Sequence, residues 1–191
     1  NGARVCTVNS ESTEIEDILK TLRDLGQDPV PHLDLERFQA LTTAPEVRSD
    51  AQREVVAYSD GLIAELKSAD VIVLAVPMYN FTVPSALHAY FDHVARAGET
   101  FRYTEKGPEG LVTGKKAYVV VTRGGVYGED HSQTRFIQQF LGFIGITDVE
   151  FIYAEGLKIS EREKAESLAR AEQRIAGLLG GSAAGAGSAQ A

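Results

Sequence analysis

The sequence contains a single cysteine, Cys6, among its 191 residues. One cysteine excludes an internal disulfide and a metal site built from several cysteines, and it favours a reducing compartment. Basic residues are also scarce, because 19 Lys and Arg against 27 Asp and Glu leave a net charge of -8. An acidic chain argues against a surface for nucleic acid or anionic membranes, which needs clustered basic residues.

Long hydrophobic runs are absent too. No apolar stretch approaches the roughly 20 residues that a membrane-spanning helix requires. The first residues show no basic segment followed by an apolar one, so no signal peptide is predicted. Together with the cysteine content, this pattern leads us to expect a cytoplasmic protein with no membrane partner.

The familiar motifs of hydrolytic, nucleotide-binding and metal sites are missing. The sequence has no G-x-S-x-G elbow, no G-x-G-x-x-G and no Walker lysine motif. Its four histidines are scattered, and His88 and His93 are five residues apart, whereas zinc ligands on one helix face are four apart. We therefore predict no metal site and no catalytic acid, base or nucleophile from the protein itself.

Two short apolar runs stand out in what the sequence does contain. Residues 71–76 (VIVLAV) end at Pro77, and residues 116–122 (KAYVVVT) end at a loop with Arg123, Gly124 and Gly125. A short apolar run stopped by a turn signal indicates a strand buried on both faces, as in a parallel sheet covered by helices. The first run is followed by a loop at residues 78–81 and then by Pro84, which suits the first turn of a helix.

Helical and extended patterns alternate along the rest of the chain. Helices are predicted at residues 13–25, 49–67, 84–97, 133–144 and 160–179, and further strands at residues 4–9 and 149–154. Residues 28–45 hold three prolines and read as a long loop, and residues 101–111 as a hairpin. The alternation predicts a doubly wound α/β fold with a parallel sheet. Residues 1–179 should form one domain, followed by a disordered low-complexity tail at 180–191.

Ligands of open α/β sheets bind outside the carboxyl ends of the strands, where residues 78–81 and 122–125 would lie. Paired glycines there allow a flat ligand to approach the backbone closely. Ser10, Ser12 and Thr13 follow the first strand, and hydroxyls at a helix N-terminus suit a phosphate group. Each feature also has an ordinary interpretation, because paired glycines form tight turns and hydroxyls cap helices.

A longer stretch closely resembles a known family. Residues 76–125 contain PMYNF, GETFRYTEKGPEGL and TRGG, and residues 140–157 begin with FLGFIGI. These motifs resemble the FMN-dependent NADH-azoreductases, also described as FMN-dependent NADH:quinone oxidoreductases. The similarity covers roughly residues 23–179.

The resemblance implies a flavodoxin-like, three-layer α/β/α fold and a homodimer with one FMN per subunit at the interface. It implies a two-step, ping-pong transfer of hydride from NADH through the flavin to quinones or azo compounds. Tyr103 and Phe143 would line the substrate pocket. The residues that would contact FMN are Ser10, Met78, Tyr79, Asn80, Phe81, Thr122, Arg123, Gly124 and Gly125.

The N-terminal part departs from the family pattern. The family has a serine-rich phosphate loop, a full helix and then a strand near residues 21–25, whereas the periodicity here predicts a helix over 13–25. Either the first helix is shortened and the second strand lost, or the sequence is altered at this end. Two other functions stay open: a flavodoxin-type electron carrier, and a non-catalytic homologue with an impaired site for the FMN phosphate.

Overall fold

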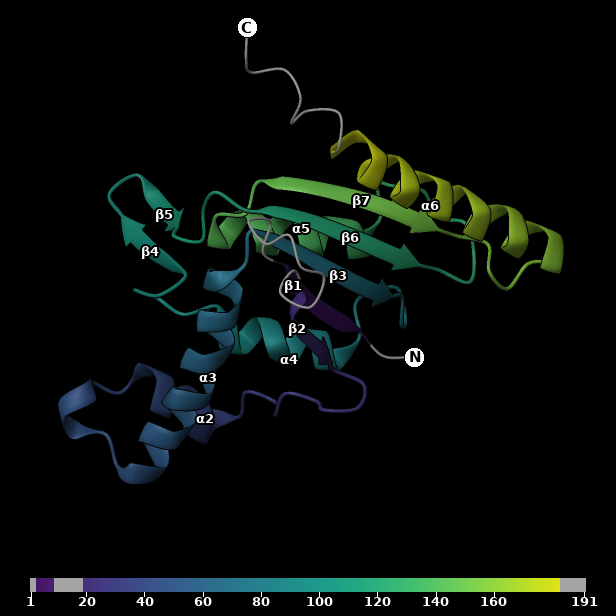
Figure 1. The fold of residues 1–191 in the computed structure, drawn as a ribbon. Helices are drawn as coiled ribbons and strands as arrows, with labels where there is room; N and C mark the ends of the chain where they lie inside the picture. Colours follow the sequence, from purple (N-terminus) through teal and green to yellow (C-terminus); the bar gives the residue numbers. More distant parts are fainter. Residues whose placement is uncertain (1–2, 9–18, 183–191) are drawn as a thin grey trace, which may run out of the picture.

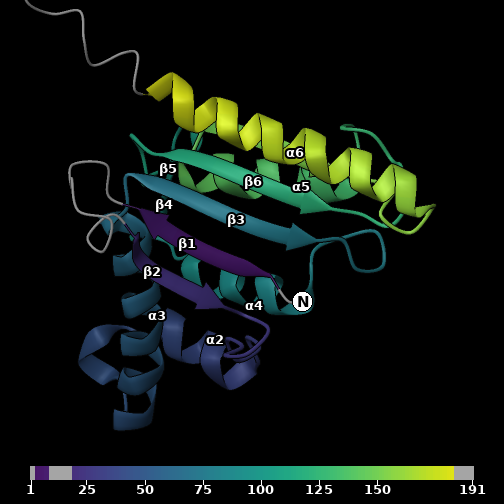
Figure 2. The same ribbon diagram turned by 45° about the vertical axis from the view of Figure 1, so that its right-hand side comes forward.

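The computed structural model describes residues 3–8 and 19–182, which form a five-stranded sheet flanked by helices (Figure 1). The strand order is β2-β1-β3-β6-β7, and Figure 2 shows β2, β1, β3 and β6 side by side in this order. The strands are β1 (Arg4–Val8), β2 (Leu19–Asp24), β3 (Val71–Pro77), β6 (Lys116–Thr122) and β7 (Asp148–Ala154). β3, β6 and β7 run parallel to one another, as the alternating pattern predicted.

One face of the parallel strands carries the main core. Ile72, Leu74 and Val76 of β3 are buried, and their register partners on β6 are the equally buried Ala117, Val119 and Val121. The core they belong to also contains side chains of α3 (Asp50–Ser68), α4 (Ser85–Val94) and α5 (Ser132–Ile144). The alternation of fully and partly buried residues along both strands follows from the period of two in a pleated strand.

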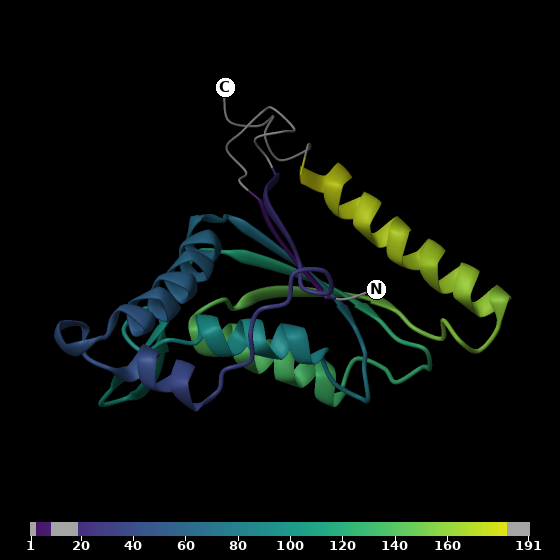
Figure 3. The same cartoon turned by 90° about the horizontal axis from the view of Figure 1, so that it is seen from below.

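The opposite face is covered by α6 (Glu161–Ser182). A smaller apolar cluster joins Ile152 and Ala154 of β7 to Ala171 of α6. Figure 3 shows α6 on one side of the sheet and α4 and α5 on the other. The three-layer α/β/α architecture is thereby confirmed. Among the described residues, no helix is long and apolar enough to cross a membrane.

Local signals placed most helix starts correctly. Ser49 and Gln52 form a capping box at the start of α3, and Ser160 accepts a hydrogen bond from the Glu163 N–H (3.1 Å) before α6. α6 continues to Ser182, beyond the predicted end at residue 179, and residues 183–191 of the predicted tail lie outside the described part of the chain.

The prediction of a helix over residues 13–25 is wrong in its second half, because residues 19–24 form strand β2. Residues 13–18 lie outside the described residues. β2 pairs antiparallel with β1, and Arg4 bonds Asp24 across the pair at 2.9 Å. Leu22, which the periodicity placed on a buried helix face, is 55 % exposed. The strand was therefore not lost, and pairing with β1 decided the conformation over the local apolar spacing.

A second correction concerns the direction of β1. The sequence predicted a wholly parallel sheet, but β1 runs antiparallel to both β2 and β3. Val8, the last residue of β1, is opposite Val71, the first residue of β3. The chain therefore leaves β1 at the edge of the sheet where the parallel strands begin.

The stretch predicted as a long loop contains a further helix, α2 (Leu35–Thr42), and a 3₁₀ turn, η1 (Pro45–Val47). Asp34 caps α2 by accepting a hydrogen bond from the Arg37 N–H at 2.8 Å. Ala40 is the only buried residue of α2, and Leu35 and Phe38 are exposed. Leu35, Phe38 and Leu41 recur every three residues, so an apolar stripe was present, but the prolines on both sides of this short segment favoured a loop. The predicted hairpin is confirmed as β4 (Phe101–Thr104) and β5 (Gly107–Gly110).

Candidate functional site

The loops after β3 and β6 meet at one edge of the sheet (Figure 1). Pro77 and Thr122 are register partners at the ends of these neighbouring strands, and the Met78 N–H donates to the Thr122 carbonyl at 2.9 Å. The structure therefore brings together the two segments that the sequence singled out, 78–81 and 122–125. Their contact with a cofactor stays a prediction.

The first loop is a tight hydrogen-bonded turn. Tyr79 and Thr82 exchange two backbone hydrogen bonds of 3.0 Å. Asn80 and Phe81 between them have φ values of 46° and 67°, a left-handed conformation that is rare for a bulky residue. The Phe81 carbonyl accepts a further hydrogen bond from Ser132 at 2.8 Å. This turn holds Tyr79 and Phe81 outward, and they are 48 % and 63 % exposed.

The second loop offers backbone donors. The Gly124 carbonyl accepts from the Lys158 N–H, and the Gly125 carbonyl accepts from the Gly156 N–H, both at 2.9 Å. Their own N–H groups find no acceptor in the part of the chain that the structure describes. Two adjacent amides without a protein acceptor can bind a carbonyl oxygen or an anionic group of a ligand.

Aromatic rings border these amides. The Tyr127 ring lies 6.2 Å from the Phe81 ring and 5.1 Å from the His131 ring, centroid to centroid. A Cβ atom at Gly125 would lie 3.0 Å from Cε2 of Tyr127. The site is therefore a backbone surface with an aromatic border, which suits a flat ligand.

Arg123, predicted as a cofactor contact, has a fully buried side chain. Its guanidinium donates to Gln133 (3.0 Å), to Thr134 (2.8 Å) and to the Gly128 carbonyl (2.6 Å). It also pairs with Glu155 at 2.8 Å. The side chain of Arg123 therefore ties the loop at Gly128 to the start of α5 and to Glu155.

Comparison with known proteins agrees with this fold. The model of a family described as having a flavodoxin-like fold matches residues 12–179. The chain belongs to this family. It is 55 % identical over 159 residues to an FMN-dependent NADH:quinone oxidoreductase of Burkholderia pseudomallei, covering 82 % of this chain and 80 % of the relative. It is 52 % identical over 159 residues to a protein of the same name from Cellvibrio japonicus, covering 81 % and 80 %.

A solved structure is similar as well. A crystal structure of an FMN-dependent NADH-azoreductase from Bacillus anthracis, in complex with FMN, matches with a TM-score of 0.71 and 26 % sequence identity. The match covers 82 % of this chain and 79 % of that one. The flavodoxin-like family and its flavin-binding members are thus established as the relatives of this chain.

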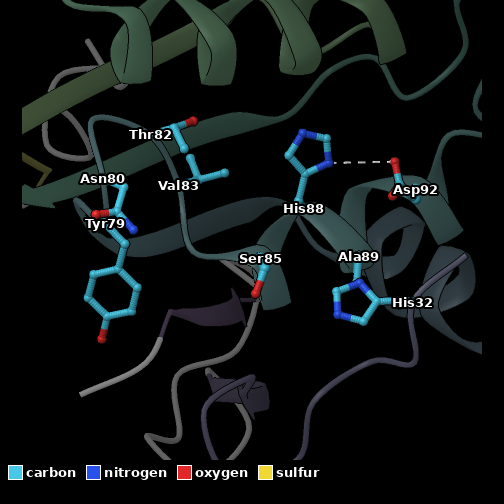
Figure 4. Close-up of a pocket in the computed structure, with 9 residues that line it drawn as sticks. All are labelled: His32, Tyr79, Asn80, Thr82, Val83, Ser85, His88, Ala89 and Asp92. Atoms are coloured by element: carbon cyan, nitrogen blue, oxygen red, sulfur yellow. Dashed lines mark ion pairs between the residues drawn. The ribbon is translucent and has the colours of Figure 1, made fainter.

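A cavity of about 460 Å³ lies beside the 79–82 turn of this flavodoxin-like chain. Figure 4 shows His88 and Asp92 of α4 joined as an ion pair on the far side of the cavity from Tyr79. Among the described residues, no cluster of three potential metal ligands occurs. The residues that line the cavity are His32, Tyr79, Asn80, Thr82, Val83, Ser85, His88, Ala89 and Asp92.

Tyr103 and Phe143, predicted to line the substrate pocket, lie away from the two loops of their own chain. Phe143 is eleven residues after Ser132, which contacts Phe81, so α5 separates it from that loop by roughly 16 Å along the helix axis. Phe143 packs on Phe101 of the β4-β5 hairpin at 4.4 Å between ring centroids. Tyr103 on the same hairpin is 76 % exposed.

Ser10, predicted to contact the FMN phosphate, lies outside the described residues. The described end of β1 leads away from the two loops, because Val8 is opposite Val71 and Pro77 comes six residues after Val71 along β3. At the rise of a strand, six residues correspond to about 20 Å.

The sequence interpretation missed Glu155 and Tyr127. Glu155 follows Ala154, the last residue of β7, so it occupies the same edge of the sheet as the two predicted loops. A carboxylate directly after a buried parallel strand was a signal that could have identified Glu155. Tyr127 gave no such signal, because only the folded loop places its ring over Gly125.

Proposed function

We propose that this chain is an FMN-dependent oxidoreductase that reduces quinones and azo compounds with NADH. Relatives at 52–55 % identity are named FMN-dependent NADH:quinone oxidoreductases, and the similar azoreductase structure contains FMN. The structural observation that carries the proposal is the pair of N–H groups of Gly124 and Gly125 beside exposed aromatic rings, at the ends of adjacent parallel strands.

The residues present fit the ring of a flavin. The 79–82 turn and residues 122–125 would hold it, with backbone on one side and Tyr79, Phe81 and Tyr127 as apolar contacts. Bound FMN supplies the hydride chemistry, and amide donors stabilise the negative charge that a reduced flavin carries. The protein therefore needs no acid or base of its own, and its part is to bind and orient.

The proposal includes a homodimer in the cytoplasm. Tyr103 and Phe143 lie at the opposite end of α5 from the two loops, so within one chain they cannot line a pocket there. In a twofold dimer the exposed hairpin with Tyr103 can reach the site of the partner subunit. Static light scattering at micromolar concentration should give twice the chain mass, and a monomer with full activity would contradict this part.

The decisive experiment is to purify the protein, record its visible spectrum with and without added FMN, and assay NADH oxidation with a quinone and with an azo dye. We expect a flavin spectrum and turnover of both acceptors. Bound flavin without turnover would favour a flavodoxin-type electron carrier. Failure to bind flavin at all would favour a non-catalytic homologue and overturn the proposal.

Affinity for the FMN phosphate needs a separate test. Since β1 leads away from the loop edge, we expect few phosphate contacts, and riboflavin should bind within roughly tenfold of FMN, a difference of about 1.4 kcal/mol. Parallel titrations followed by flavin fluorescence measure both dissociation constants. A preference for FMN of a thousandfold would mean that a full phosphate site exists.

A further inference from the structure

A buried ion pair adjoins the loop that carries the Gly124 and Gly125 amides. The Arg123 side chain is 0 % exposed and the Glu155 side chain 17 %, and their charged groups are 2.8 Å apart. Arg123 comes from the end of β6 and Glu155 from the end of β7. The pair therefore joins two neighbouring strands at the edge where ligands of this fold bind.

Glu155 also holds the loop backbone. Its Oε1 accepts from the Tyr127 N–H at 3.1 Å and its Oε2 from the Gly128 N–H at 3.3 Å. Arg123 holds the same turn from the other side, because its Nη1 donates to the Gly128 carbonyl. One carboxylate and one guanidinium thus fix both ends of residues 123–128.

The pair is itself anchored by two helices. The Glu155 N–H donates to Ser167 of α6 at 2.9 Å, and Ser167 is buried. Arg123 donates to Gln133 and Thr134 in the first turn of α5, and both of these side chains are buried as well. The loop is therefore fixed relative to both helical layers, and its shape does not depend on its own sequence alone.

We propose that Arg123 and Glu155 are positioning residues, which hold residues 124–128 so that the Gly124 and Gly125 N–H groups stay available to the flavin. This inference rests on the proposed function, since it assumes that the flavin is the ligand of these amides. Neither side chain touches the cofactor in this proposal. Preorganised donors stabilise a negative charge without having to reorient. Loosening the loop should therefore weaken the binding of reduced FMN, which carries that charge, more than the binding of oxidised FMN.

The test compares Glu155→Gln with Asp130→Asn. Both variants replace a carboxylate that pairs with an arginine, but the Asp130–Arg135 pair is exposed and lies outside the loop contacts. Glu155→Asp keeps the charge and shortens the reach, so it serves as a milder variant if Glu155→Gln fails to fold by circular dichroism. FMN titrations on oxidised and on dithionite-reduced samples give the two dissociation constants of each variant.

We expect Glu155→Gln to raise the dissociation constant of oxidised FMN by roughly tenfold and that of reduced FMN by more, with Asp130→Asn unchanged. Amide exchange of Tyr127 and Gly128, followed by NMR on the protein without FMN, should also become roughly tenfold faster in Glu155→Gln. Equal losses for oxidised and reduced FMN, or wild-type affinity in Glu155→Gln, would overturn the inference while the proposed function stands. A wild-type protein that binds no FMN would overturn both.

Discussion

The two loops that form the candidate site reach their shapes by different means. The 79–82 turn closes on itself through two backbone hydrogen bonds and accepts positive φ values at Asn80 and Phe81. Residues 123–128 make few bonds with one another and are held by Glu155 and by side chains of α5. The first loop is shaped mainly by its own bonds, whereas the second depends on α5, on α6 and on Glu155 after β7.

This difference determines how each loop should respond to substitution. Replacing a residue in a local turn disturbs mainly the turn itself, so the effect on the free energy of unfolding should be small. A loop that shares a buried charge with the core transmits a substitution to the whole domain, because an unpaired buried charge is costly. The substitutions below test this contrast, beginning with the largest expected effect.

Arg123→Met should produce the largest loss. It leaves the Glu155 carboxylate without its cation and Gln133 without its partner, so we expect a loss of about 3–5 kcal/mol in the free energy of unfolding, measured by urea denaturation. Arg135→Met, which breaks the exposed pair with Asp130, is the control and should leave the unfolding midpoint unchanged. Equal effects of the two substitutions would show that the buried pair does not hold the fold.

Gly125→Val tests whether the Gly124 and Gly125 N–H groups bind the flavin, and it leaves the Arg123–Glu155 ion pair in place. Its Cβ would meet the end of the Tyr127 ring, which can move, so the protein should still unfold cooperatively. The valine side chain should keep a flat ligand off the backbone donors and weaken FMN binding by roughly tenfold or more. Gly177→Val on α6, where an added Cβ atom would meet nothing within 4 Å, is the control. Unchanged flavin content in Gly125→Val would remove this loop from the site.

Phe81→Gly tests the local loop. Glycine relieves a left-handed conformation that costs a side chain about 1–2 kcal/mol, but it also adds freedom to the unfolded chain. We expect a net stabilisation of about 0.5–1 kcal/mol in urea denaturation, together with weaker FMN binding because an exposed ring is lost. Thr82→Gly, one residue on and with an ordinary φ, should instead destabilise. A destabilised Phe81→Gly variant would mean that the ring supports the fold.

His93 gives the smallest predicted effect, a pH dependence. Burial lowers the pKa of His93, whose Nε2 lies 3.1 Å from the Pro31 carbonyl. Since the unfolded chain then takes up the proton first, the free energy of unfolding should fall as the pH drops below about 6.5. His93→Gln should flatten this slope between pH 7 and pH 5.5 in urea denaturation. His88→Gln, at an exposed position, should keep the slope, and an equal change in both variants would exclude His93 as its source.

Much of the fold and of the candidate site could be predicted from the sequence. The apolar runs of β3 and β6 are long enough to specify buried strands on their own, and their following residues had to emerge at one edge because parallel strands end together. The capping residues Ser49 and Ser160 likewise specify helix starts through bonds to their own neighbours.

What the sequence could not specify depends on pairing between distant segments. The conformation of residues 19–24 follows from their register against β1, and the direction of β1 follows from its pairing with β3. The motif around Arg123 likewise gave no sign that its side chain pairs in the interior with Glu155, 32 residues later. Local periodicity and caps are encoded within a few residues, whereas strand partners and buried charge pairs are chosen only when the whole sheet and its helices pack together.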